Sequence, residues 1–111
     1  MFSIIIPTFN NLQYLKNCLN SIKKHSIKNH EIILHVNDGS DGTLEFVNVN
    51  NYKFTSSKEN IGLCSSINKA AKLAKTNYIL YAHDDMYFCP NWDEYLIKEI
   101  NKIGHENFYL S

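Results

Sequence analysis

The chain opens with FSIIIPTFN, residues 2–10, and this stretch decides the fold that the remaining sequence must join. Its first part, Phe2 to Ile6, is a nearly continuous apolar run. Such a run is typical of a strand buried on both faces, as strands of a parallel sheet are. Because proline lacks a backbone N–H, we expect the strand to end at Pro7. The stretch therefore predicts a parallel sheet with a polar turn after its first strand.

Strand-like and helix-like segments alternate along the rest of the chain. Asn10 or Asn11 can cap a first helix, in which apolar residues recur at helical spacing. Further strand-like runs lie at 31–36, 52–55 and 78–82, and further helical stretches at 63–77, 90–103 and, more weakly, from 44 onward. The alternation predicts one α/β domain over residues 1–111, with a mainly parallel sheet flanked by helices.

The end of the chain suggests that this domain is incomplete. Gly104 is a good stop for the last helix. The residues after it, Phe108–Leu110, have the character of a new strand, and the sequence ends at Ser111. We therefore expect a domain truncated at its C-terminus.

Composition and charge exclude several classes of protein. The eleven basic residues balance the eleven acidic ones, so we expect no nucleic-acid partner. The three cysteines lack metal or redox spacing, which favours a reducing compartment. Residues 1–10 do not resemble a signal peptide and no apolar run is long enough for a transmembrane segment. The sequence thus predicts a cytoplasmic protein, with peripheral contact with a membrane left open.

Three polar groups follow predicted strands: Pro7–Asn10, Asn37–Ser40 and His83–Asp85. In open parallel sheets, ligands bind beyond the carboxyl ends of the strands. Each group taken alone is more often an ordinary turn or a charged patch of surface. Their joint position at one edge of the sheet is what indicates a binding site.

The paired carboxylates Asp84 and Asp85 suit a hard divalent cation. Two adjacent anions are unfavourable unless a cation joins them. Carboxylate oxygens suit Mg²⁺ or Mn²⁺, which commonly complete their coordination with phosphate oxygens and water. Such a cation would carry the charge that develops on a diphosphate leaving group. His83 is a candidate outer-sphere partner, although a solvated loop histidine is the commoner case.

Asp38 suggests a different role, because a carboxylate at a strand end can accept a hydrogen bond from a base N–H or a ribose hydroxyl. Gly39 and Gly42 would allow the backbone to approach such a ligand closely. The segment is neither a GxGxxG nor a Walker A sequence, so neither a dinucleotide cradle nor a P-loop is indicated.

Taken together, these stretches resemble the family 2 glycosyltransferases of the GT-A fold. Four segments carry the resemblance in the family's order: Ser3–Asn10, Val36–Thr43, Glu59–Ala71 and Tyr78–Trp92. The resemblance implies a Rossmann-like GT-A half that binds a nucleoside diphosphate sugar, with a UDP-sugar as the first guess and Mn²⁺ or Mg²⁺ as the metal.

The resemblance also implies roles for individual residues. Thr8 and Asp38 would bind the nucleoside, Asp84 would lie near the ribose and diphosphate, and Asp85 would be the main metal ligand. The complete set implied for the donor is Pro7, Thr8, Asp38, Asn60, Asn68 and Asp84.

This sequence departs from the family pattern at several positions. Asn37 replaces the usual first aspartate, Ile67 stands where many relatives have arginine, and His83 begins the metal motif where aspartate or asparagine is common. The family's acceptor region and catalytic base lie beyond the point matching Ser111. None of the remaining carboxylates matches that base: Asp93, Glu94, Glu99 and Glu106.

Two functions follow as expectations. The first is inverting transfer of a sugar from a nucleoside diphosphate donor to an acceptor, with a base activating the acceptor hydroxyl. The second is a non-catalytic nucleotide-binding or partner-binding module, acting as a homo-oligomer or with a separate acceptor domain. Nucleotidyl transfer is disfavoured because residues 7–12 lack a loop rich in glycine and basic residues.

Overall fold

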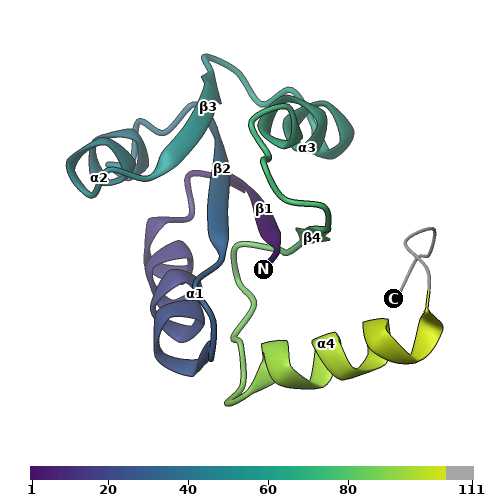
Figure 1. The fold of residues 1–111 in the computed structure, drawn as a ribbon. Coiled ribbons are helices and arrows are strands. Elements are labelled where there is room, and N and C mark those ends of the chain that lie inside the picture. Colours follow the sequence, from purple (N-terminus) through teal and green to yellow (C-terminus); the bar gives the residue numbers. More distant parts are fainter. Residues whose placement is uncertain (105–111) are drawn as a thin grey trace.

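The computed structural model describes residues 1–104 and shows a parallel sheet with helices on both faces (Figure 1). The strands are β1 (Ser3–Phe9), β2 (Glu31–Asn37), β3 (Lys53–Ser57) and β4 (Ile79–Tyr81). The helices are α1 (Leu12–His25), α2 (Thr43–Val49), α3 (Leu63–Ala71) and α4 (Trp92–Ile103). The strand order is β3-β2-β1-β4, and every pair is parallel. The predicted α/β fold class is therefore confirmed.

The isoleucines of β1 show why a continuous apolar run suits a central strand. Ile4 and Ile6 pack with Leu15 and Leu19 of α1. Ile5 points to the other face, where it packs with Ala70 of α3. Successive side chains of a strand alternate between faces, so a strand covered on both sides needs apolar residues at every position. Figure 1 shows α1 and α2 on one side of the sheet and α3 on the other.

β1 does not end at Pro7, contrary to the expectation from sequence. It continues to Phe9 and pairs with β2 along its whole length. Ser3 and Ile5, which precede Pro7 by four and two residues, make backbone hydrogen bonds on the side of β1 that faces β4. Ser3 N donates to Tyr78 O, and Ile5 O accepts from Ala82 N. The nitrogen of Pro7 faces that same side, where β4 has already ended at Tyr81. The missing N–H therefore costs no ladder hydrogen bond.

The start of α1 is held by a residue that the sequence did not single out. Asn11 is at the N-cap position, but its side chain makes no capping hydrogen bond within the described residues. Instead, Leu12 N donates to Asp41 Oδ2 over 3.2 Å. The other oxygen of Asp41 accepts from the backbone N and the hydroxyl of Thr43 at the start of α2. One carboxylate therefore caps two helices.

α3 is shorter than expected and ends at Ala71 rather than near Asn77. After it, Leu73 N and Ala74 N bond back to carbonyls only three residues earlier, which tightens the chain into a turn. Lys75 N then donates to Glu31 Oε1 over 2.8 Å. The carboxylate of Glu31 thus ties Lys75, four residues after the end of α3, to the start of β2.

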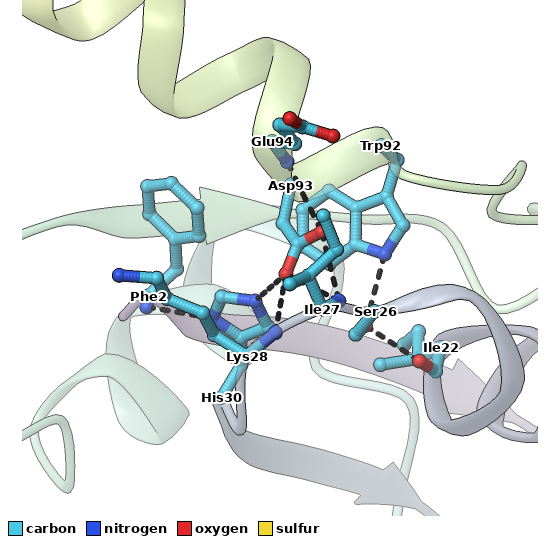
Figure 2. Close-up of polar contacts among 9 residues, drawn as sticks. All are labelled: Phe2, Ile22, Ser26, Ile27, Lys28, His30, Trp92, Asp93 and Glu94. Atoms are coloured by element: carbon cyan, nitrogen blue, oxygen red, sulfur yellow. Dashed lines mark hydrogen bonds and ion pairs between the residues drawn. The ribbon is translucent and has the colours of Figure 1, made fainter.

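The start of α4 is anchored to the loop between α1 and β2 (Figure 2). Asp93 is fully buried and accepts hydrogen bonds from Ile27 N, Lys28 N and His30 Nε2. Phe2 N donates to Nδ1 of His30, so the ring hydrogen lies on Nε2 and the imidazole is neutral. Burial would raise the pKa of Asp93, but the bonds from Lys28, His30 and Ile27 outweigh it and hold that pKa at about 2.

Two further expectations concern membranes and the end of the chain. Within residues 1–104, no helix has the length and apolar character needed to cross a bilayer. The strand expected from Phe108–Leu110 lies outside the described residues.

Candidate functional site

A pocket of about 380 Å³ lies where the ends of β1, β2 and β4 meet the start of α3. Four of the residues predicted to bind a donor line it: Pro7, Thr8, Asn60 and Asp84. The other lining residues are Phe9, Asn11, Asn37, Gly62, Leu63, Ser66 and His83. The structure thus brings together three polar segments that are far apart in the sequence, because parallel strands place their carboxyl ends at one edge.

A side-chain hydrogen bond joins two of the three segments. The hydroxyl of Thr8, at the end of β1, donates to Oδ2 of Asp84 over 2.8 Å. Thr8 is buried and Asp84 is half-buried. Because β1 and β4 are neighbours, their ends bring these residues together, and the bond fixes one carboxylate oxygen at the wall of the pocket.

Asn37, at the end of β2, makes side-chain hydrogen bonds to residues on several sides of the pocket. Its Nδ2 donates to the carbonyl of Thr8 and to Oγ of Ser66 in α3. Its Oδ1 accepts from Ser57 Oγ and from Ile61 N. The sequence placed Asn37 in the polar group at this edge and in the position of the usual aspartate, but gave it no binding role, and it did not single out Ser66. A polar residue among the apolar positions of α3 was the only signal available for Ser66.

A buried histidine lies next to this group. His35 of β2 contacts the hydroxyls of Thr55 and Ser57 through its two ring nitrogens, over 2.7 and 3.0 Å. Burial lowers the pKa of His35, and the positive charge of Lys69 lowers it further. The imidazole is therefore neutral at neutral pH and serves as a packed polar group beneath the pocket.

Asp38 lies just beyond Asn37 but is not among the residues lining the pocket. It accepts hydrogen bonds from Nδ2 of Asn10 and from Oγ of Ser40. These two bonds, that from Asn10 first, lower the pKa of Asp38, so it is a carboxylate at neutral pH. Its φ is +61°, an uncommon conformation that asparagine and aspartate tolerate best.

Local packing requires a glycine at position 39. A Cβ there would lie 2.6 Å from Val36 Cγ1 and 3.0 Å from Leu44 Cβ, and φ is +79°. The glycine is thus required by the close packing of the turn against its own neighbours. The expected close approach of this backbone to a ligand stays a prediction.

The segment after β4 carries the paired carboxylates. Asp85 is exposed, and His83 lines the pocket with its ring 4.9 Å from that of Tyr81. Cys18 lies beneath this segment and its thiol contacts the carbonyl of His83. Burial, followed by the charges of Asp84 and Asp85, raises the pKa of Cys18 to about 11. This cysteine is therefore an unreactive thiol that packs in the core.

Three predicted site residues are not among those lining the pocket: Asp38, Asn68 on the exposed surface of α3, and Asp85. The roles expected for them stay predictions. A metal ion bound by Asp84 and Asp85 would need further ligands from outside the protein. Within residues 1–104, no group of three His, Cys, Asp or Glu is arranged to hold one. Sharing with phosphate oxygens and water is common for Mg²⁺.

The described carboxylates of α4 are engaged away from the pocket. Asp93 is buried against the loop before β2. Glu94 and Glu99 are exposed and pair with lysines of the same helix, Lys98 and Lys102. Glu106 lies outside the described residues.

The fold has close counterparts among solved structures. TarS from S. aureus, solved over residues 1–349 in complex with UDP, matches with a TM-score of 0.79 and 26% identity, covering 91% of this chain and 32% of that 1–349 chain. The same protein in complex with UDP-GlcNAc matches with a TM-score of 0.75. These structures share the GT-A glycosyltransferase fold expected from the sequence.

Sequence relatives agree with this likeness. An uncharacterised glycosyltransferase of Rickettsia typhi is 34% identical over 96% of this chain and 34% of its own length. The chondroitin synthase of Pasteurella multocida is 36% identical over 92% of this chain and 11% of its own length. The chain thus spans about a third of the Rickettsia relative. The profile of the family described as glycosyl transferase family 2 matches residues 3–111, and this chain therefore belongs to that family.

Proposed function

We propose that the pocket binds the nucleoside diphosphate of a sugar donor, with UDP the first candidate, and that the whole protein transfers the sugar to an acceptor with inversion. The observation that carries this proposal is the Thr8–Asp84 hydrogen bond, which joins the ends of β1 and β4 beside the pocket. The UDP and UDP-GlcNAc complexes of TarS support the choice of nucleotide.

The walls of the pocket suit the parts of a nucleotide. Phe9 and Leu63 are about half exposed and give apolar surface suited to a nucleobase. α3 begins at Leu63, and no described side chain caps it. Its first N–H groups and the positive end of its dipole therefore favour an anion such as a phosphate.

A divalent cation would complete the site. Asp85 is proposed as its main protein ligand, with Asp84 next to it and diphosphate oxygens filling the other positions. Bound there, Mn²⁺ or Mg²⁺ would stabilise the negative charge on the departing diphosphate. The chain's own contribution is to hold Asp84 in place through Thr8 and to keep Asp38 ionised beside the pocket.

Calorimetric titration with UDP, GDP and dTDP in the presence of Mn²⁺ tests the proposal. We expect UDP to bind, and to bind more weakly when EDTA removes the metal. UMP, which lacks the second phosphate, should bind more weakly than UDP. The Glu99→Gln variant, changed on exposed α4, is the matched control and should bind as the parent does. No heat from any of the three nucleotides at about millimolar concentration would refute a donor site.

A non-catalytic nucleotide-binding or partner-binding module is the second candidate. The observation that favours it is the engagement of the α4 carboxylates away from the pocket. A positioned general base contributes ~10²–10⁴-fold to a rate. Release of UDP from a panel of UDP-sugars separates the two functions. Binding without acceptor-dependent release supports the module, whereas rapid release supports a transferase.

A further inference from the structure

We propose that Asn37 is a positioning residue that sets the shape of the pocket, and that in this chain, where Asn37 stands in place of the family's usual aspartate, its hydrogen-bond partners require an amide. The inference rests on the proposed nucleotide-binding function. Asn37 is only 3% exposed, and hydrogen bonds engage both polar atoms of its side chain. It acts through the residues that it holds.

The hydrogen-bond partners of Asn37 fix the orientation of its side-chain amide. Its Nδ2 lies 3.3 Å from the carbonyl of Thr8, and a carbonyl can only accept. The same Nδ2 lies 3.0 Å from Oγ of Ser66. The single hydrogen of that hydroxyl has a nearer acceptor in Gly62 O, at 2.6 Å, than in Asn37 Oδ1, at 3.5 Å. Ser66 must therefore accept from Asn37. Both partners demand a donor, and the amide NH₂ supplies two hydrogens.

The other half of the amide needs an acceptor. Ile61 N, a donor, lies 3.0 Å from Asn37 Oδ1, and Ser57 Oγ lies 3.1 Å from the same oxygen. Position 37 must therefore donate on one side and accept on the other. An aspartate carboxylate can accept from Ile61 but cannot donate to Thr8 or Ser66. Two oxygens would then face oxygens across a buried gap, which is unfavourable.

Two of these partners, Thr8 and Ser66, line the pocket on opposite sides. Thr8 lies in the wall that holds Asp84, whereas Gly62, Leu63 and Ser66 form the wall at the start of α3. Asn37 thus links the two walls across the floor. A change at this position alters the separation of the walls, and with it the fit of a nucleotide, without removing a group from the rim.

The test compares Asn37→Asp, which keeps the size and removes the donor, with Ile22→Ala as a control for stability. Ile22 is a core residue in the last turn of α1 and does not line the pocket. Circular dichroism first establishes a temperature at which both variants are folded. Titration with UDP and Mn²⁺ at that temperature then gives each dissociation constant.

Because Asn37→Asp also adds a negative charge that would repel the diphosphate, the same titration is made with uncharged uridine. We expect Asn37→Asp to weaken binding of both UDP and uridine by about tenfold or more, in line with the loss of a buried hydrogen bond, and Ile22→Ala to leave both within about twofold. An effect of Asn37→Asp no larger than that of Ile22→Ala would overturn the positioning role. If the parent chain itself binds no UDP, the proposed function fails instead, and the two failures are thus distinguishable.

Should Asn37→Asp not fold, Ser66→Ala provides the same test more gently. It removes the acceptor on α3 and leaves in place the bond that Asn37 donates to Thr8 and the bond that it accepts from Ile61. Severalfold weaker UDP binding by this folded variant supports the proposal, and unchanged binding contradicts it.

Discussion

Thr8 and Asp84 are 76 positions apart in the sequence, yet the hydroxyl of Thr8 donates to the carboxylate of Asp84 over 2.8 Å. The contact exists because β1 and β4 are adjacent and parallel, with Ser3 paired to Ile79. It holds a half-buried carboxylate at the wall of the pocket, next in sequence to the exposed Asp85 that we propose as the metal ligand. The proposed donor site therefore depends on the order of the strands.

Removing the hydroxyl of Thr8 should loosen Asp84. Thr8→Val keeps the branched shape and loses the donor, so we expect UDP binding in Mn²⁺ to weaken by about tenfold. Thr8→Ser keeps the hydroxyl and should bind nearly as the parent does. Calorimetric titration of both variants measures the difference. Equal losses in the two would indicate that the methyl group matters and not the hydrogen bond.

Asp38 should contribute to nucleoside binding independently of metal. In Asp38→Ala we expect UDP and uridine to bind severalfold more weakly, both with Mn²⁺ and with EDTA, because the proposed role is a hydrogen bond to the nucleoside. Ser40→Ala, which removes one of the bonds to Asp38, is the milder companion variant. An unchanged affinity in a folded Asp38→Ala protein would exclude this role.

Asp85 and Asp84 should differ in their dependence on metal. Asp85→Asn removes the charge and keeps the shape, so it should abolish the strengthening of UDP binding by Mn²⁺ while the fold stays intact. Asp84→Asn should reduce binding less. Titrations with and without Mn²⁺ provide the comparison. Strengthening by Mn²⁺ in Asp85→Asn equal to that in the parent would show that the metal ligand lies elsewhere.

Asp93 should stabilise the fold in a pH-dependent manner. Its pKa falls from 3.8 to about 2 on folding. The stabilisation is therefore complete above about pH 4 and is lost as the pH falls toward 2, and such a shift corresponds to about 2–3 kcal/mol.

Urea unfolding of the parent and of Asp93→Asn measures this contribution. The difference in unfolding free energy between the two should be large at pH 7 and shrink below pH 4. Glu99→Gln changes an exposed pair and should alter stability by less than about 1 kcal/mol. A difference between parent and Asp93→Asn that is constant with pH would contradict the assigned carboxylate.

Gly39 should tolerate alanine poorly because two effects coincide there. Its φ is +79°, and an added Cβ would meet Val36 Cγ1 at 2.6 Å. Gly104 provides the control, since its φ is +75° and no atom of residues 1–104 lies within 4 Å of an added Cβ. Gly104→Ala should cost about 1–2 kcal/mol for conformation alone, and Gly39→Ala clearly more. Equal losses in thermal or urea unfolding would show that the turn relaxes around the new methyl group.

Some features of the fold were predictable from short stretches of sequence. The run of isoleucines in β1 indicated a strand buried on both faces, because side chains of a strand alternate and each face needs apolar contacts. Gly104 could be predicted to end the last helix, because a residue in the left-handed conformation, usually glycine, commonly ends a helix. These signals are local, and local stereochemistry is enough to interpret them.

Other features depend on contacts between residues that are distant in the sequence, and no local sequence pattern predicts these contacts. The strand passes through Pro7 without penalty only because β4 ends before reaching it. The capping of α1 by Asp41 needs the turn after β2 to lie beside the end of β1. The two donated bonds of Asn37 run to residues 29 positions away on either side, in β1 and α3.

The sequence by itself determined a parallel α/β sheet, the polar residues at its carboxyl edge and the resemblance to the family. Only the tertiary structure decided which of those polar side chains meet: Thr8 with Asp84, Asn10 with Asp38, and Asn37 with Ser66. The physical reason is the range of the interactions. Hydrophobic periodicity reflects neighbours a few residues apart, whereas these hydrogen bonds join residues that only the strand order and register bring within 3 Å.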